Sequence, residues 1–131
     1  MMRALVMDFG NDGKACVVET QFMLGKEIMV CPVTEAQYTT NVPDAKADFS
    51  VTGTRKLYLP SGTFWYDFWT GEKLKGGQEV VKETPVNIIP LYIKAGSILP
   101  LGPEIQYSTQ QYDPVEIRVY QGADGKFVLY D

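Results

Sequence analysis

The acidic side chains are the first candidates for chemistry, because the sequence contains no histidine. Histidine is the usual general base of serine and cysteine hydrolases and the commonest ligand of transition metals, so neither kind of site is expected. Catalysis by carboxyl groups requires two of them facing one bond, roughly 5 to 9.5 Å apart. The acids at the ends of apolar segments or inside strand-like ones are Asp8, Asp67, Asp113 and Glu116. Their spacing predicts no such pair, and we expect turn, hydrogen-bonding or solvated roles for them.

The densest group of unusual residues is the aromatic segment FWYDFW at 64–69. In a strand its side chains would alternate between two faces, so both faces would carry aromatic surface. Such a surface could stack on sugar rings or pack against a neighbouring domain. Packing is the stronger expectation, because aromatic side chains bury so much area. The candidate residues for interdomain packing or sugar stacking are Trp65, Tyr66, Asp67, Phe68 and Trp69.

The cysteines and glycines indicate no further chemistry. The spacing of Cys16 and Cys31 fits no zinc or redox motif, and Cys31 lies in an apolar run where a buried free thiol is expected. The glycines are spread among turns and form no phosphate-binding loop. The sequence therefore predicts no catalytic, substrate-binding or metal-binding residue and no cofactor.

The composition is that of one ordinary globular domain. The chain has 131 residues, of which 45% are hydrophobic and 21% charged, and a net charge of −4 with no basic cluster. We therefore expect no nucleic-acid partner. The apolar segment between Arg3 and Asp8 is too short for a signal peptide, and no segment approaches the ~20 apolar residues of a membrane-spanning helix.

The first apolar segment, residues 4–7, is typical of a strand buried on both faces. Such strands belong to parallel sheets or barrels, yet the sequence around it lacks the alternating strands and helices that such a sheet needs. We next expect one or two helical turns over residues 19–24, ended by Gly25 as a cap. An apolar strand over residues 28–33 should follow.

The rest of the chain is predicted to be β-structure. Residues 34–53 are polar, include Asn41 and Pro43, and predict a long loop. Short segments separated by turns then favour an antiparallel β-sandwich, with Pro90 and Pro100 at edges or bulges. The expected strands are 55–59, 64–69, 72–74, 78–83, 88–93 and 97–101.

The last segment predicts a hairpin. Val115, Ile117 and Val119 alternate with polar residues, and the turn at Asp124-Gly125 leads into an apolar strand over 126–130. A strand without partners at one end and a chain that stops on a strand at the other indicate a fragment cut at both ends.

Several stretches of the chain, taken in order, resemble glycoside hydrolase family 31. They are MRALVMDF at 2–9, QFMLG at 21–25 with IMVCPV at 28–33, YLP at 58–60 with WYDFWTG at 65–71, and IPLYIKAGSILPL at 89–101. The tail segments IRVY at 117–120 and DGKFVLYD at 124–131 resemble the start of the family's distal sandwich.

The resemblance implies an all-β antiparallel sandwich with a short N-terminal strand and helix left over from a (β/α)8 barrel. Residues 1–33 would be the last strand and helix of that barrel, 34–105 the proximal C-terminal β-sandwich and 106–131 the start of the distal one. Family members are retaining α-glycosidases whose catalytic aspartates lie on earlier barrel strands. The family's Trp-Asp-Met-Asn nucleophile segment does not occur in this sequence.

The resemblance therefore implies a non-catalytic C-terminal part of an α-glycosidase, inactive alone and supporting the barrel. The insertion at 34–54 and the tail resemble α-xylosidases, which act on α-xylosides such as xyloglucan oligosaccharides, more than α-glucosidases. The expected partner is the barrel of the same enzyme, with carbohydrate reached only through it. Without that barrel, the strand at 4–7 would favour self-association. One alternative is a stand-alone carbohydrate-binding module using Trp65, Tyr66 and Trp69; another is a protein-interaction sandwich.

Overall fold

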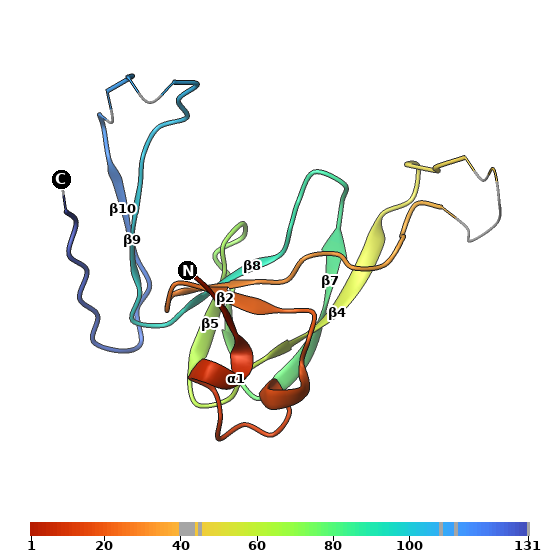
Figure 1. Cartoon of the computed structure of the whole chain (residues 1–131), viewed down its shortest axis with the longest axis horizontal. Helices are drawn as coiled ribbons and strands as arrows, with labels where there is room; N and C mark the ends of the chain where they lie inside the picture. Colours follow the sequence, from red (N-terminus) through yellow and green to blue (C-terminus); the bar gives the residue numbers. More distant parts are fainter. Residues whose placement is uncertain (40–43, 45, 108, 112, 131) are drawn as a thin grey trace. The chain divides into compact units, whose positions relative to one another are not determined.

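The structure is a computed structural model of the chain, and it describes residues 1–39, 44, 46–107, 109–111 and 113–130. Asn41 and Pro43, which the loop prediction named, and the final residue Asp131 lie outside the described residues. The chain divides into two compact units, Met1–Lys94 and Ala95–Asp131, and each is described by itself (Figure 1). The predicted boundaries at 33 and 105 refer to a longer enzyme and stay a prediction.

The first unit is built on a six-stranded antiparallel sheet. Its strand order is β1-β2-β3-β8-β5-β6, and every neighbouring pair is antiparallel. The strands are β1 (Met2–Ala4), β2 (Phe22–Leu24), β3 (Ile28–Val30), β5 (Phe64–Asp67), β6 (Lys73–Lys75) and β8 (Leu91–Lys94). The aromatic strand β5 thus lies inside the sheet, between β6 and β8.

A two-stranded ribbon, β4 (Gly53–Leu59) and β7 (Gln78–Thr84), packs on this sheet (Figure 1). The chain enters β7 from β6 through Gly76, where a Cβ would lie 2.1 Å from the carbonyl oxygen of Pro60. Glycine is required there because no side chain fits so close to a backbone. The ribbon forms a second layer over one face of the sheet, because side chains of β4 share a buried cluster with those of the sheet.

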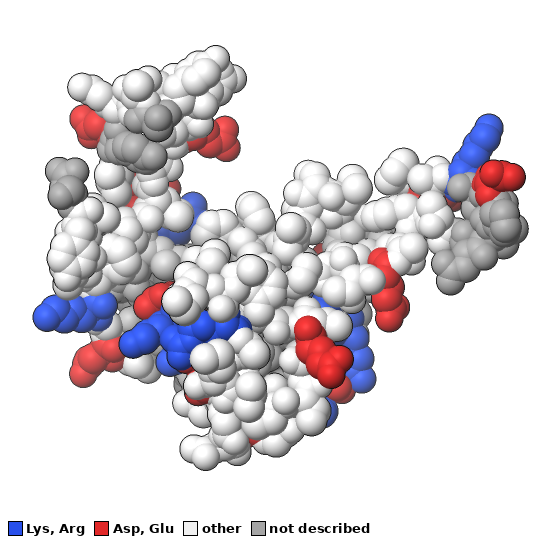
Figure 2. Space-filling view, in the orientation of Figure 1, with Lys and Arg blue, Asp and Glu red and all other residues white. Residues whose placement is uncertain are grey.

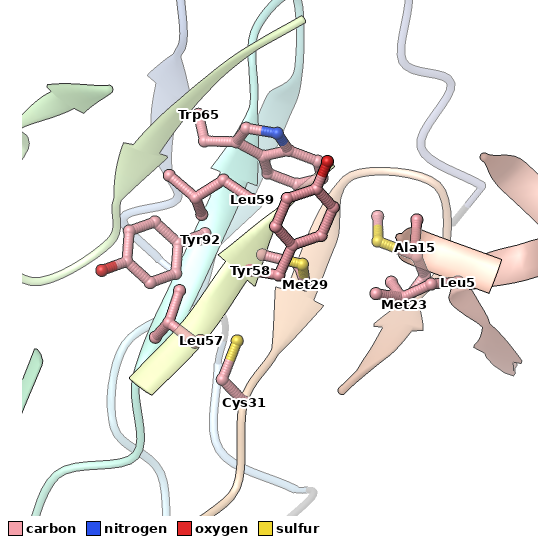
Figure 3. Packing of buried hydrophobic residues seen from close by; sticks show 10 residues of the cluster. All are labelled: Leu5, Ala15, Met23, Met29, Cys31, Leu57, Tyr58, Leu59, Trp65 and Tyr92. Carbon is pink, nitrogen blue, oxygen red and sulfur yellow. The ribbon is translucent and has the colours of Figure 1, made fainter. Parts of the chain in front are cut away.

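The core of the first unit lies between these two layers. It joins side chains from both layers with one each from the helical turns α1 (Leu5–Asp8) and η1 (Ala15–Val17), as Figure 3 shows. The buried side chains are Leu5, Ala15, Met23, Met29, Cys31, Leu57, Tyr58, Leu59, Trp65 and Tyr92. The predicted all-β antiparallel sandwich is confirmed.

The prediction of a strand over residues 4–7 is wrong. Only Ala4 belongs to β1, and the chain then makes the single helical turn α1, closed by a hydrogen bond of 2.9 Å from the Phe9 amide to the Leu5 carbonyl. Leu5 enters the core, whereas Val6 is 46% exposed and Met7 66% exposed. A strand buried on both faces needs neighbours on both sides, and among the described residues β1 pairs with β2 alone.

The helical turns predicted over 19–24 are also wrong, because this segment ends in the strand β2. Gln21 and Met23 are buried while Phe22 and Leu24 face outward, which is the alternation of a strand. Gly25, expected as a helix cap, instead has a φ of 69° in the turn that leads to β3. The alternation of buried and outward side chains favours a strand in this segment, and hydrogen bonding to β1 and β3 stabilises that strand.

The second unit contains the antiparallel pair β9 (Ile98–Leu101) and β10 (Glu116–Val119). Pro100 lies opposite Ile117 in a ribbon of two strands, so it occupies an edge strand as expected. Residues 126–130 form no strand, and the predicted hairpin is therefore wrong. Val115, Ile117 and Val119 are exposed, so their alternation marks no buried face within this unit. Across the described residues, no helix is long and apolar enough to span a bilayer.

Candidate functional site

The aromatic strand β5 buries one of its three aromatic side chains, Trp65, in the core. Trp65 has no exposed surface, its ring lies 5.6 Å from that of Phe9, and its indole N–H donates to the Pro60 carbonyl at 2.9 Å. Burial of the whole indole with its one polar group satisfied is the arrangement of a packing residue. Trp65 offers no surface on which a sugar ring could stack.

The outward face of the aromatic segment exposes only part of its aromatic surface. Trp69 follows β5, is 50% exposed, and donates its indole N–H to the Ile89 carbonyl at 2.8 Å. Its ring meets that of Phe68 edge-on, with ring centres 5.1 Å apart. On β5 itself, the Lys73 ammonium lies 4.6 Å from the ring centre of Phe64 and 5.6 Å from that of Tyr66. Within this segment, Trp69 and Phe64 are therefore the exposed aromatic side chains, and Tyr66 and Phe68 are partly exposed.

Asp67 is buried beside Trp65 and joins the two layers. Its side chain is 2% exposed and pairs at 2.5 Å with Lys82 on β7, while the Trp69 and Thr70 amides donate to the other oxygen at 2.8 and 3.0 Å. Burial acts to raise the pKa of Asp67, but the lysine and the two amides outweigh it and lower the pKa. This carboxylate is a structural tie between the sheet and the ribbon.

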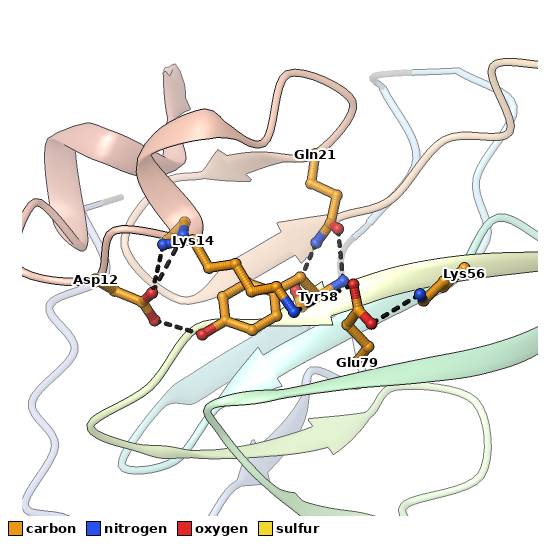
Figure 4. Close-up of polar contacts among 7 residues, drawn as sticks. Asp12, Lys14, Gln21, Lys56, Tyr58 and Glu79 are labelled. Atoms are coloured by element: carbon orange, nitrogen blue, oxygen red, sulfur yellow. Dashed lines mark hydrogen bonds and ion pairs between the residues drawn. The ribbon is translucent and has the colours of Figure 1, made fainter.

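A second carboxylate, Asp12, fastens the N-terminal segment to the ribbon (Figure 4). One oxygen accepts the Lys14 and Ala15 amides at 3.0 and 3.2 Å, and the other accepts the Tyr58 hydroxyl and the Ser61 amide, both at 2.8 Å. Burial acts to raise the pKa of Asp12, but these hydrogen bonds lower it well below its ordinary value. Burial and the bond to Asp12 raise the pKa of Tyr58 to about 12.

Neighbouring polar groups extend this contact along β4. The Gln21 side-chain amide donates to the Tyr58 carbonyl and accepts from the Tyr58 amide, both at 2.8 Å, as a neighbouring strand would. Glu79 binds Lys56 at 2.8 Å and Lys14 at 3.3 Å, and both interactions lower its pKa. Asp12, Gln21 and Lys14 thus tie residues 12–21 to the sandwich; we call these contacts the Asp12 clamp.

Replacing Asp12 with alanine should lower the free energy of unfolding by about 1 to 3 kcal/mol, because amide and hydroxyl donors lose a charged acceptor. Urea unfolding followed by circular dichroism measures the change. Asp48→Ala is the control, because among the described residues the Asp48 carboxylate accepts bonds from Ser50 alone, at 2.9 and 2.5 Å, and its removal should cost less. Equal losses in the two variants would contradict the role of the clamp.

The other acids named from the sequence have separate partners. Asp8 pairs with Arg3 at 2.6 Å, and in the second unit Glu116 pairs with Arg118 at 2.5 Å. Asp113 precedes Pro114 through a cis peptide bond. Asp8, Asp67 and Glu116 each form an ion pair with a different cation. No group of three or more His, Cys, Asp or Glu side chains suited to a metal ion occurs among the described residues.

Cys31 is the buried free thiol that the sequence predicts. Its side chain has no exposed surface, and burial raises its pKa to about 12. A thiol that stays protonated is a poor nucleophile. Cys16 is free and half-buried.

The surface around α1 is apolar and hollowed. A depression of about 450 Å³ is lined by residues of β1, α1, η1 and β2 and by their connections, including Val6, Val18 and Phe22. Met2, Val6, Met7, Val17 and Leu24 are all at least 44% exposed. On the face of the molecule in Figure 2, acidic and basic side chains are interspersed, without an extended basic patch.

Sequence reasoning did not identify the clamp. Asp12 sits in the turn Asn11-Asp12-Gly13, where an acid is unremarkable, and its partners Tyr58 and Ser61 are far away in the sequence. The sequence likewise gave no indication of the structural roles of Gln21 and Lys82. The one available signal was the alternation around Gln21, which places a polar side chain at a core position.

Comparisons with known proteins agree with the fold. Residues 1–99 match the model of the glycosyl hydrolase family 31 C-terminal domain. An α-xylosidase of Saccharolobus solfataricus is 37% identical over all of this chain and 16% of its own length, and α-glucosidase 2 of Bacillus thermoamyloliquefaciens is 29% identical over all of this chain and 15% of its own.

A solved structure agrees as well. The family 31 α-xylosidase of Xanthomonas citri superimposes with a TM-score of 0.78 and 38% identity over 96% of this chain and 12% of that protein. The chain thus spans about 15 to 16% of the length of these curated relatives. The matched residues include the aromatic strand, the clamp and most of the core, and the chain belongs to glycoside hydrolase family 31 as a part of its C-terminal region.

Proposed function

We propose that this chain is the non-catalytic C-terminal part of a retaining α-glycosidase and that it supports the catalytic barrel. The observation that carries the proposal is the way the N-terminal segment is held. Leu5 and Ala15 are 0% and 1% exposed in the core of the sandwich, and the Asp12 clamp fixes the turn between them. A segment anchored so firmly gives a neighbouring barrel a rigid base.

The exposed apolar surface around α1 supports the same proposal. Apolar side chains gathered at one site mark a contact surface. The partner we propose for it is the barrel of the same enzyme, which would cover Val6, Met7 and Val17. Precise support matters for catalysis, since displacing a catalytic group by about 1 Å can cost roughly a hundredfold in rate.

The enzyme that we propose as the parent is an α-xylosidase. The support is that two α-xylosidases, from Saccharolobus solfataricus and Xanthomonas citri, are 37% and 38% identical to this chain over nearly all of it. The kcat/KM of the full-length parent for 4-nitrophenyl α-xyloside should exceed that for the α-glucoside. A higher value for the α-glucoside would overturn this part of the proposal and leave the supporting role untouched.

The 131-residue chain alone should hydrolyse neither substrate. Measurable turnover by the purified chain, retained through further purification, would contradict a non-catalytic role. Calorimetric titration with xyloglucan oligosaccharides and malto-oligosaccharides tests the alternative of a binding module, which in this structure depends on Tyr66 and Trp69 because Trp65 is buried. We expect no binding heat; heat that disappears in Trp69→Ala would favour the module.

A further inference from the structure

We infer that Arg55 forms a binding site for a small oxyanion, either a carboxylate or a phosphate. Arg55 lies in β4, is 8% exposed, and forms no ion pair within the described part of the chain. A buried charge without a counter-ion is costly, so buried guanidinium groups are normally paired. The guanidinium group therefore requires an anion that the described residues do not supply.

The strand register places a second cation beside Arg55, which increases its requirement for a counter-ion. Arg55 lies directly opposite Lys82 in the antiparallel pair of β4 and β7, so both side chains point to the same face. Lys82 has its own counter-ion in the buried carboxylate of Asp67 on β5, which lies 2.5 Å away and also accepts two amides. Asp67 is thus the counter-ion of Lys82, and no carboxylate among the described residues pairs with Arg55.

The guanidinium group has donors to spare. One Nη donates to the Thr34 hydroxyl at 3.2 Å and the other to the Thr20 carbonyl at 2.8 Å. The Nε–H is buried and has no acceptor among the described residues. Arginine carries five N–H groups in a planar fork that matches the two oxygens of a carboxylate.

A polar hollow of about 230 Å³ lies beside Arg55 and has room for such a ligand. Thr20 and Thr34 line it, and the Thr34 hydroxyl, which accepts from Arg55, retains its own O–H to donate. Two charged residues also line it. Lys56 sends its ammonium to Glu79, and Glu35 is exposed, so solvent screens its repulsion of an anion.

Cys31 does not supply the missing charge. Its thiol interacts electrostatically with Arg55, but burial keeps it protonated at neutral pH. The oxyanion can be a free carboxylate or phosphate ion, or a carboxylate side chain from the rest of the parent enzyme. This second source rests on the proposed function, whereas the site itself does not.

The test uses arginine-selective ¹⁵N labelling of the 131-residue chain, which has three arginines, Arg3, Arg55 and Arg118. Their Nε–Hε signals are assigned with Arg3→Lys and Arg118→Lys and followed while sodium acetate or phosphate replaces sodium chloride at constant ionic strength. We expect a saturable shift of the Arg55 signal in the millimolar range. Arg3 and Arg118, already paired with Asp8 and Glu116, serve as internal controls.

Two results would overturn the inference: no saturable shift of the Arg55 signal with either anion, or equal shifts of all three signals, in which case water alone meets the Nε–H. Acetate should also raise the melting temperature of the chain, and Arg55→Gln should abolish that rise. If the variant does not fold, the titration of the unmodified chain decides the question. In the parent enzyme, a rise with acetate identifies a free-ion site. Its absence there, with a shift in the isolated chain, identifies a carboxylate of the enzyme itself.

Discussion

Replacing Trp65 with alanine should lower the free energy of unfolding by about 3 to 5 kcal/mol, the usual cost of removing a large aromatic side chain from a core. The indole has no exposed surface and is enclosed by both layers of the sandwich, with its N–H bound to Pro60. The loss combines transfer of the indole to water with the cavity left between the layers. Urea unfolding followed by far-ultraviolet circular dichroism measures it.

Trp69→Ala is the matched control, since it removes the same side chain at a position that is 50% exposed. Its cost should be clearly smaller, because half of that indole already meets water. If Trp69→Ala proved as costly as Trp65→Ala, the assignment of Trp65 to the core and Trp69 to the surface would be wrong. The pair therefore separates packing from surface roles within one aromatic segment.

Replacing Asp67 with asparagine should lower the stability by about 3 kcal/mol at pH 7, since it leaves the largely buried Lys82 without its counter-ion. The folded-state pKa of Asp67 is lowered, so its ionised form is favoured in the folded chain. Its contribution is therefore fully present above the unfolded pKa of about 3.9 and is lost as the pH falls through the folded value.

The difference between the unmodified chain and Asp67→Asn should consequently shrink as urea unfolding is repeated from pH 7 toward pH 3. Glu83→Gln is the control, because Glu83 is an exposed acid on the same strand β7 and should change stability by no more than about 0.5 kcal/mol. A difference between the chain and Asp67→Asn that stayed constant over this pH range would show that the charge of Asp67 does not stabilise the fold.

The β-structure could be predicted where local patterns and tertiary packing agree. Residues 55–59 and 78–83 were predicted as strands and fall within β4 and β7, because alternating side chains between turn residues suit a half-buried ribbon. Of the strand predicted over residues 64–69, residues 64–67 form β5, and the chain turns at residues 68–70. In these segments the sequence period and the burial pattern carry the same information.

The predictions failed where the decisive partner lies elsewhere. Residues 4–7 are apolar enough for a buried strand, but Leu5 finds its place in the core as part of a helical turn. Residues 126–130 alternate little and gain no strand pairing. An apolar run predicts that a segment is buried, but the segments that pack against it decide whether it forms a strand or a helical turn.

The polar contacts were the least predictable part. The Asp12 clamp joins a turn to a strand 46 residues away, and Arg55 reaches Thr20, 35 residues away. Individual acids and arginines in a sequence do not reveal which of them become buried or paired. The strand register gives the neighbours of each charged side chain, as where it places Arg55 opposite Lys82.

The central claim is that this chain supports a family 31 barrel without taking part in the chemistry. It is tested most directly by placing residues 1–131 into the Xanthomonas citri α-xylosidase in place of the matching segment, which is 38% identical. The chimera should fold and hydrolyse an aryl α-xyloside with a kcat/KM within about tenfold of the host, a difference of about 1.4 kcal/mol in barrier. A chimera that folds as stably as the host but has lost about a thousandfold or more in kcat would contradict the claim, because the replaced segment would then contribute to the reaction itself.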